Sequence, residues 1–263
     1  MPTLVLSPRY TPDSQALWNA ALQAGWSVER LHSHHPPAWL RDKDPAIYGE
    51  ALFANIVADE LSLALLEPPF DWLARLPEKY LQRNIEYMTL GEARKRSERA
   101  FVKPAYDKSF DAAVYDSGVA LPVGEVFPDA MPVLVAEPVV WGIEFRCFVL
   151  DGKIASLSPY SRNGELVQDE DGRWRASDDE SDGAFAFVDR VLNDRHVDLP
   201  PAFVMDVGTI EGRGWGLVEA NPAWASGIYG CDAAAVLPVL KRACVRQEDL
   251  AAEDRRWVNE RLV

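Results

Sequence analysis

The sequence lacks any apolar run near the roughly 18 residues that a membrane-spanning helix needs. It carries only three cysteines among 263 residues, and their wide spacing among apolar neighbours is typical of buried free thiols in a reducing compartment. Its first residues have neither the basic start nor the long apolar stretch of a secretory signal. Internal repeats and low-complexity tracts are also missing. These absences predict a cytoplasmic protein that does not enter a membrane.

Positive charge is also scarce in this chain. Lysine and arginine number 27 against 41 aspartates and glutamates, so the formal net charge is −14. A general binder of nucleic acid or of anionic membranes needs a basic surface, and the composition therefore argues against both. It leaves room for a bound nucleotide, because one metal ion and a few cations suffice for that. It also favours a basic protein partner over an acidic one.

The remaining composition, 48% hydrophobic and 26% charged, is ordinary for a globular protein. The length suffices for one large domain or for two closely joined domains. Residues 3–6 have the pattern of a buried strand, a helix follows between Pro12 and Gly25, and residues 26–31 have the pattern of a second strand. This β-α-β order predicts a small α/β domain over residues 1–90, followed by a second domain over residues 91–263.

Apolar side chains at helical spacing over residues 45–67 predict one long helix, and a similar pattern near Trp257 predicts a last one. Three histidines, His32, His34 and His35, stand just after the second strand. No cysteine or acidic residue lies at a suggestive spacing from them, so a loop end is favoured over a metal site.

Two short apolar runs, residues 203–207 and 216–222, flank a glycine-rich connection that is typical of a hairpin. Side chains alternate across a strand, so Asp206 faces one side of the first run, and Glu219 and Asn221 share one side of the second. An antiparallel hairpin brings these oxygen ligands together, and such a set suits Mg²⁺. The alternative, a strand end and a turn with no ligand, explains each residue singly but explains all three together less well.

Lys103 stands in an apolar run, residues 100–104, where an unpaired buried ammonium group is costly. Two interpretations stay open for it. Either its stem packs while its head reaches water, or its ammonium group meets an anion. Lys108, five residues further on, either meets the same anion or is solvated.

Residues 143–150 alternate between apolar and charged side chains. Glu144 and Arg146 therefore share one face of the expected strand, and the apolar side chains share the other. Two interpretations stay open here as well. The charges belong to a functional site, or they form a cross-strand network on a solvated face.

Taken in order, these segments resemble the ATP-grasp superfamily over roughly residues 90–245. The series consists of Lys103-Pro104, Glu137-Pro138-Val139, Trp141-Gly142-Ile143-Glu144-Phe145-Arg146, Asp206, and Glu219-Ala220-Asn221-Pro222. The resemblance implies an α+β protein with an ATP-grasp fold, in which two α+β lobes grip ATP, preceded by a small α/β N-terminal domain. The Glu-Phe-Arg strand resembles a divergent clade, which includes a eukaryotic cell-division-cycle factor that helps to assemble a translation-initiation complex. That clade also contains bacterial and phage members of unknown substrate.

The resemblance assigns cofactor-binding roles to these residues. Lys103 would contact the phosphates of ATP, and Glu144 would accept hydrogen bonds from the ribose hydroxyls. Glu137 and Val139 would form the hinge that meets adenine, with Val139 as the backbone donor because the intervening proline has no N–H. The ligands that would hold Mg²⁺ on the triphosphate are Asp206, Glu219 and Asn221.

Catalytic roles follow from the same resemblance. Arg146 would neutralise charge that builds on the phosphoryl group or on an acyl phosphate. Arg162 would be a second active-site arginine or a surface residue, and we favour the site. A further phosphate-binding cation is expected before the first lysine motif, and Lys79 and Arg83 are equal candidates for it.

One loop departs from the family pattern. Many family members have a glycine-rich loop after the first lysine motif, but residues 105–111 contain no glycine. Lys108 would replace backbone N–H groups of that loop, or the loop would close differently over the phosphates.

The activity implied is ATP-dependent activation of a carboxylate, followed by attack of an amine or a thiol, with release of ADP and phosphate. The acceptor would be a small molecule, a peptide or a protein. The alternative is an assembly factor that binds ATP and clamps a partner protein without turnover. A phosphotransferase that uses the same cleft is a third option.

Overall fold

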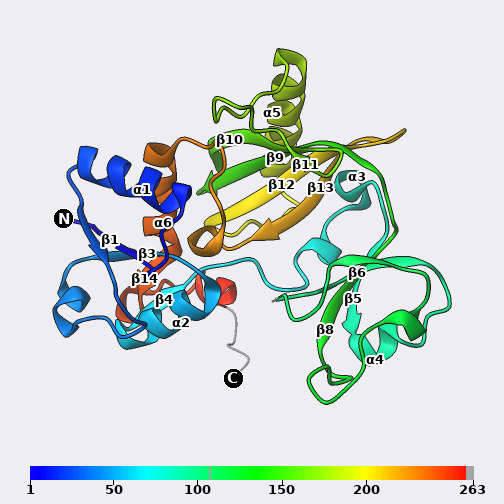
Figure 1. The fold of residues 1–263 in the computed structure, drawn as a ribbon, viewed down its shortest axis with the longest axis horizontal. Helices are drawn as coiled ribbons and strands as arrows, with labels where there is room; N and C mark the ends of the chain where they lie inside the picture. Colours follow the sequence, from blue (N-terminus) through cyan, green and yellow to red (C-terminus); the bar gives the residue numbers. More distant parts are fainter. Residues whose placement is uncertain (107, 259–263) are drawn as a thin grey trace.

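The computed structural model describes residues 1–106 and 108–258. Its elements form three groups: a parallel sheet with its helices, a central five-stranded antiparallel sheet, and a separate four-stranded sheet (Figure 1). The parallel group supplies the predicted small α/β unit, and the other two groups are α+β. None of the helices in the described ranges combines the length and the apolar character that spanning a bilayer requires.

The N-terminal unit is a parallel sheet in the order β2-β1-β3. Its strands are Thr3–Leu6 (β1), Ser27–Arg30 (β2) and Pro45–Tyr48 (β3). Between β1 and β2, α1 (Pro12–Gln23) begins at Thr11, whose hydroxyl accepts a hydrogen bond from the N–H of Ser14 in a capping box. The predicted β-α-β opening is confirmed, and β3 extends it by one parallel strand.

The predicted long helix over residues 45–67 is wrong. The segment forms β3, then α2 (Ala51–Glu60), then β4 (Leu63–Leu65). Sheet pairing decides this outcome, because β3 joins β1 and β4 pairs with β14 (Cys244–Arg246) from the far end of the chain. The predicted last helix is wrong as well, since Gln247–Asp249 and Arg255–Trp257 form only short 3-10 turns.

Helix α6 (Ala233–Ala243) joins the C-terminal part of the chain to the N-terminal unit. One buried apolar core contains side chains of this helix, of the parallel sheet and of the central sheet, among them Leu237, Leu240, Leu4, Ile47, Phe148 and Val204. The N-terminal unit is therefore packed directly against one end of the central sheet. Its loops at that end lie close to the middle of the molecule.

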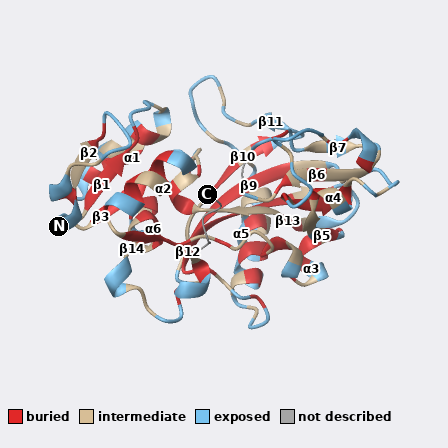
Figure 2. Ribbon diagram, turned by 90° about the horizontal axis from the view of Figure 1, so that it is seen from below, coloured by how far each residue is buried: buried red, intermediate tan, exposed pale blue. Residues whose placement is uncertain are grey.

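The central sheet runs in the order β11-β10-β9-β12-β13. Its strands are Glu165–Leu166 (β11), Lys153–Arg162 (β10), Trp141–Leu150 (β9), Ala202–Ile210 (β12) and Gly214–Asn221 (β13). Helices α5 (Asp178–Leu192) and α3 (Glu78–Leu81) contribute to the core on one face, and α6 packs on part of the other (Figures 1 and 2). The uncovered part of that second face carries the charged side chains of the candidate site.

The four-stranded sheet forms a separate lobe in the order β5-β8-β6-β7. Its elements are Ile85–Thr89 (β5), Leu90–Ala93 (α4), Ala100–Pro104 (β6), Ala113–Tyr115 (β7) and Pro132–Ala136 (β8). Short 3-10 turns elsewhere are Ala38–Asp42, Leu73–Arg75, Gly118–Ala120 and Ala223–Ala225. The predicted domain division at residue 90 stays a prediction, and β5, just before it, pairs with β8.

Gly118 lies in this lobe where two stretches of backbone approach closely. A Cβ added there would overlap the carbonyl oxygens of Ala93 and Arg94, which cannot move aside as a flexible side chain can. We expect Gly118→Ala to lower the free energy of unfolding by about 2 kcal/mol, measured by urea denaturation. Val119→Ala, at the exposed next position, should change it by less than about 0.5 kcal/mol. Equal stability of the two variants would contradict the close approach.

Candidate functional site

The two faces of β9 have different partners. Ile143, Phe145 and Cys147 are buried in the core beneath α5, whereas Glu144 and Arg146 point to the opposite face. The predicted alternation is confirmed. The solvated-network interpretation of these charges is wrong, because Glu144 is 8% exposed and Arg146 is 6% exposed. Burial of two charged groups at the centre of a sheet requires compensating partners, and both residues have them.

Arg146 is paired with Asp206 on the neighbouring strand. The register of β9 and β12 places the two residues opposite each other, with Nε 2.9 Å from Oδ1 and Nη2 2.6 Å from Oδ2. Asp206 is fully buried. Burial raises the pKa of Asp206 to about 6, although the guanidinium group opposes this shift. Burial opposes the charge on Arg146 too, but Asp206 outweighs it and raises the pKa of Arg146.

Glu219 lies on the other side of Asp206, opposite it in the β12–β13 register. Its Oε2 is 2.7 Å from Nζ of Lys103, and its Oε1 accepts a hydrogen bond of 2.8 Å from Asn221. Burial would raise the pKa of Glu219, but the Lys103 ammonium group and Asn221 outweigh it and hold the pKa at about 2. Lys103 comes from β6 in the other lobe, so this ion pair links the two lobes (Figure 1). The interpretation in which Lys103 meets an anion is confirmed, and the anion is Glu219.

The remaining side of Arg146 is closed by a loop that follows β13. Its Nη1 donates to the carbonyl oxygen of Gly227 at 2.9 Å. The ring of Tyr229 lies over the guanidinium group at 4.7 Å and stacks on Tyr160 at 5.0 Å. Tyr229 has a φ of 48°, which is strained for an aromatic residue. Sequence reasoning missed this loop, and its signal was a tyrosine between closely spaced glycines.

Glu144 uses both carboxylate oxygens within the protein. Oε2 accepts from the Tyr160 hydroxyl at 2.7 Å, and Oε1 accepts from the Ser161 hydroxyl at 3.0 Å. A ribose would have to share these oxygens or replace one donor. The role of Glu144 in ribose binding stays a prediction.

The predicted hinge lies between β8 and β9. Glu137 is exposed there and pairs with Arg213, which lowers the pKa of the carboxyl group. The Glu137 N–H donates to the carbonyl oxygen of Asn84 at 2.9 Å. Val139 is half-buried two residues further on. The assignment of both residues to adenine stays a prediction.

Of the two candidates for a further cation, only Arg83 is buried near the predicted nucleotide residues. It donates to the carbonyl oxygens of Leu217 and Val218, where β13 has an extra residue relative to β12. Burial lowers the pKa of Arg83 to about 10, against the opposing charges of Glu137 and Glu144. Lys79 instead pairs with Asp194 at 2.6 Å, on the exposed side of α3.

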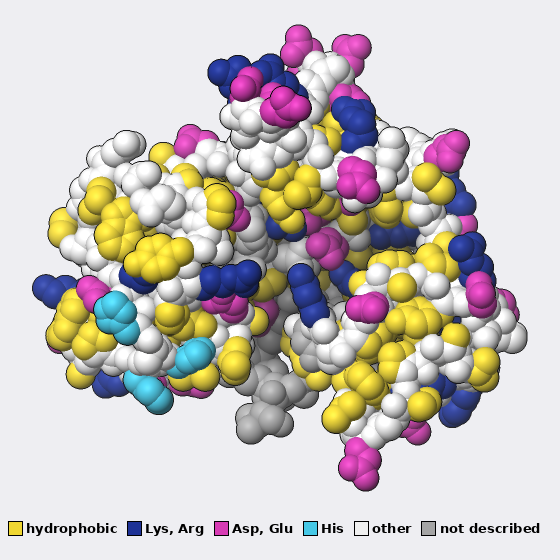
Figure 3. Space-filling model, in the orientation of Figure 1, with side chains coloured by type: hydrophobic (Ala, Val, Ile, Leu, Met, Phe, Trp, Pro, Cys, Tyr) yellow, Lys and Arg dark blue, Asp and Glu magenta, His cyan; other side chains and the backbone are white. Residues whose placement is uncertain are grey.

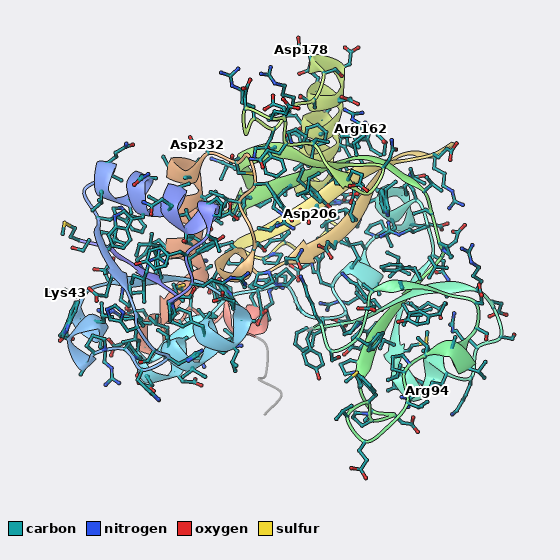
Figure 4. The ribbon with its side chains drawn as sticks, viewed as in Figure 1. Lys43, Arg94, Arg162, Asp178, Asp206 and Asp232 are labelled. Carbon is teal, nitrogen blue, oxygen red and sulfur yellow. The ribbon has the colours of Figure 1, made fainter. Side chains whose placement is uncertain are left out.

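Two predicted cations do not reach the cluster formed by Lys103, Glu219, Asp206 and Arg146. Lys108 is exposed in the connection between β6 and β7. Arg162 pairs with Glu180 at the start of α5, with separations of 2.7 and 2.9 Å. Figure 4 labels Asp206 at the middle of the central sheet and Arg162 towards α5. The structure therefore gives Arg162 a position outside the cluster.

The Arg162–Glu180 pair supports a prediction on pH. The Arg162 guanidinium group holds the pKa of Glu180 down at about 2, helped by Ser177, whereas an unfolded glutamate titrates near about 4.3. The pair therefore stabilises the fold above that pH, and the contribution is lost as the pH falls towards 2. We expect Arg162→Gln to cost about 0.5 kcal/mol at pH 7, with the gap in melting temperature from wild type closing between pH 4.5 and pH 2. A gap that stays constant would count against the pair, and Arg173→Gln is the control.

The donor set at β12 and β13 fits Mg²⁺. Asp206 and Glu219 supply carboxylate oxygens and Asn221 supplies an amide oxygen, and Mg²⁺ commonly takes only one or two carboxylates and fills its shell with water and phosphates. No group of three histidine, cysteine, aspartate or glutamate side chains suited to a metal exists within residues 1–106 and 108–258. That finding also removes the histidines after β2 as a metal site in these residues. In this structure Arg146 and Lys103 neutralise the two carboxylates.

Comparison with known proteins places the chain in a family. Residues 80–239, more than half of the chain, match a family that is described as an ATP-grasp domain and is the second family of its clade. The fold and the site thus define an ATP-grasp protein. Within that superfamily the chain belongs to this second family, and its clade is a divergent one, as the sequence predicts. No curated protein matches the sequence significantly.

Solved structures show the same fold at low sequence identity. D-cycloserine synthetase DcsG is 15% identical with a TM-score of 0.57, and the match covers 91% of this chain and 98% of that one. N5-carboxyaminoimidazole synthetase from Staphylococcus aureus complexed with ADP is 11% identical with a TM-score of 0.58, over 91% and 77% of the two chains. D-alanine–D-alanine ligase from Bacillus anthracis is 10% identical with a TM-score of 0.51, over 91% and 96%. These likenesses confirm the ATP-grasp fold with its preceding α/β unit.

Proposed function

We propose that this protein is an ATP- and Mg²⁺-dependent ligase that joins a carboxylate to an amine, or to a thiol, through an acyl phosphate. One observation carries the proposal beyond family membership. Lys103 of one lobe meets Glu219 of the other, directly beside the buried Arg146–Asp206 pair. Cations and carboxylates from two lobes are thereby concentrated at one place, as binding and reaction of a triphosphate require.

The nucleotide would lie between the two lobes in this proposal. Lys103 would contact its phosphates, Glu144 its ribose, and the backbone around Glu137 and Val139 its adenine. Bound Mg²⁺ would neutralise charge on the phosphates, and the residues that would hold it are Asp206, Glu219 and Asn221. Lys103 then exchanges its carboxylate partner for a phosphate, so the link between the lobes passes through the nucleotide.

Arg146 supplies a fixed positive charge at the reacting end. The substrate carboxylate attacks the γ-phosphorus and ADP leaves; the amine then attacks the acyl carbon, phosphate leaves and the nitrogen loses a proton. Three N–H groups of Arg146 are held by Asp206 and Gly227. Each terminal nitrogen of a guanidinium group carries two N–H groups, so one on each remains for the substrate. The net charge of −14 favours a basic acceptor, such as a peptide or protein.

Nucleotide binding is the first test of this proposal. We expect wild type to bind ATP in the presence of Mg²⁺ by calorimetry, and Lys103→Ala to weaken that binding by about tenfold or more, because a charge-assisted contact to phosphate is lost. Mg²⁺ alone should bind more tightly to Lys103→Ala than to wild type, because Glu219 loses its competing cation. Lys95→Ala, an exposed lysine of the same lobe, is the control and should match wild type. Equal ATP affinity in Lys103→Ala would exclude Lys103 from the nucleotide site.

Turnover is the second test. Hydroxylamine intercepts acyl phosphates, so a carboxylate library with MgATP and hydroxylamine should yield a hydroxamate and ADP in equal amounts. ADP formation without hydroxamate, with phosphate appearing on the acceptor, would indicate a phosphotransferase. Binding of MgATP with no turnover, together with a stable partner complex, would indicate an assembly factor instead.

A further inference from the structure

The guanidinium group of Arg146 faces two different environments. On its Nη2 side lie Asp206 at 2.6 Å and Glu219 at 4.0 Å, and Glu219 is bound by Lys103. On its Nη1 side lies the carbonyl oxygen of Gly227 at 2.9 Å. The first side is the one that the proposed function gives to phosphate and metal. The second side is not used by that function.

Asp13 of the N-terminal unit stands on this second side. A Cβ added to Gly227 would be 3.1 Å from Oδ2 of Asp13 and 3.8 Å from Nη1 of Arg146, so the loop at Gly227 is sandwiched between the two side chains. Oδ2 accepts a hydrogen bond of 2.9 Å from the N–H of Ile228. Asp13 thereby reaches from α1 to the reacting end of the central sheet.

The charge of Asp13 has no counterion in the described part of the chain. Asp13 takes part in none of the ion pairs formed there, although it is half-buried. Burial raises the pKa of its carboxyl group, and Arg146, further away, only partly offsets this shift. Tyr48, itself buried at the end of β3, hydrogen-bonds to the carboxylate and orients it. A carboxylate that is oriented, half-buried and uncompensated has the properties of a site for a cation.

We propose that Asp13 binds the ammonium group of the acceptor substrate, on the side of Arg146 opposite Lys103. This inference rests on the proposed function, whose amine half it locates. An organic ammonium group fits better than a metal ion, because the described residues place no set of three acidic, histidine or cysteine ligands here. The acceptor nitrogen would then be held beside the guanidinium group that neutralises the acyl phosphate. Figure 3 shows the molecule hollowed between the N-terminal unit and the small-sheet lobe, which leaves an approach to this side.

A purely structural role of Asp13 predicts a different outcome from this one. Asparagine keeps an oxygen that accepts from the Ile228 N–H and from the Tyr48 hydroxyl, so Asp13→Asn preserves the anchoring of the loop. It removes only the charge. If anchoring were the whole role, the substitution would be silent in binding measurements.

The test uses the full chain saturated with MgADP and two defined amine probes, glycinamide and Nα-acetyl-lysine amide. These probes mimic a chain terminus and a lysine side chain, and their N-acetylated forms, which lack the ammonium group, are the ligand controls. We expect calorimetry to show binding of at least one amine and of neither acetylated form. Asp13→Asn should weaken amine binding by about tenfold, as loss of a charge-assisted hydrogen bond implies, with the affinity for MgADP unchanged. Tyr48→Phe should weaken amine binding by a smaller factor.

Glu50→Gln is the matched protein control, because Glu50 is an exposed acid at the same end of the parallel sheet, 3.7 Å from Arg9. It should leave amine and MgADP binding as in wild type. Equal amine affinity in wild type and Asp13→Asn would overturn the inference. Binding of MgADP to wild type with no binding of either amine would overturn it too, while leaving the nucleotide site intact. Failure to bind MgADP at all would overturn the proposed function and this inference with it.

Discussion

Glu219→Gln is expected to abolish MgATP-dependent ADP formation, with kcat/KM falling by at least about 100-fold. Glu219 contacts Lys103 and Asn221 and lies 4.0 Å from Arg146, so it joins every part of the proposed phosphate site. Glutamine keeps the size of the side chain and an oxygen for the lysine, but it removes the charge that would hold Mg²⁺. The fold should therefore survive while turnover is lost. Steady-state ADP release with a hydroxamate-forming substrate measures the effect.

The control for this variant lies on the same hairpin. Glu211→Gln removes an equal charge at the exposed end of the hairpin, away from Lys103, and should leave kcat/KM within about twofold. Melting temperatures of both variants should stay close to wild type. Retention of turnover within about threefold in Glu219→Gln would show that the hairpin carboxylate is not part of the reacting site.

Local sequence patterns were sufficient to find the charged faces of β9, β12 and β13. Period-two alternation is a property of a single strand, so the positions of Arg146, Asp206 and Glu219 relative to their own neighbours could be predicted without knowing the fold. The burial of these residues could not be predicted in this way. It depends on the loop at Gly227 and on Tyr160 and Tyr229, which cover the guanidinium group only after β9, β10 and the C-terminal segment have come together.

Pairings across long sequence separations account for the errors and omissions. The segment over residues 45–67 has helical periodicity, but its ends become strands because β1 and β14 offer partners that are distant in sequence. Lys103 and Glu219 are 116 positions apart, and only the closure of two lobes shows that one is the anion of the other. Asp13 gave no sequence signal beyond a place in the first turn of a helix, where acidic residues are common for helix stability alone.

The Arg146–Asp206 pair leads to the second large expected effect. Arg146→Gln leaves the fully buried Asp206 without its bidentate partner, and we expect a loss of about 3–5 kcal/mol in the free energy of unfolding. The double variant Arg146→Gln with Asp206→Asn replaces the ion pair by two neutral amides of similar shape. Most of the stability should return in the double variant, because no uncompensated charge remains buried. Urea denaturation of the single and double variants measures the coupling.

Turnover should not return with stability in that double variant. Arg146 is expected to act on the reacting phosphate through its charge, and neither amide supplies one. ADP formation should stay at least about 100-fold below wild type although the protein is folded. Arg175→Gln, which breaks the more exposed pair with Asp169, is the control and should cost less than about 1 kcal/mol with turnover unchanged. Recovered turnover in the double variant would make the buried pair a structural element only, whereas stability without turnover would separate the packing role of Arg146 from its chemical one.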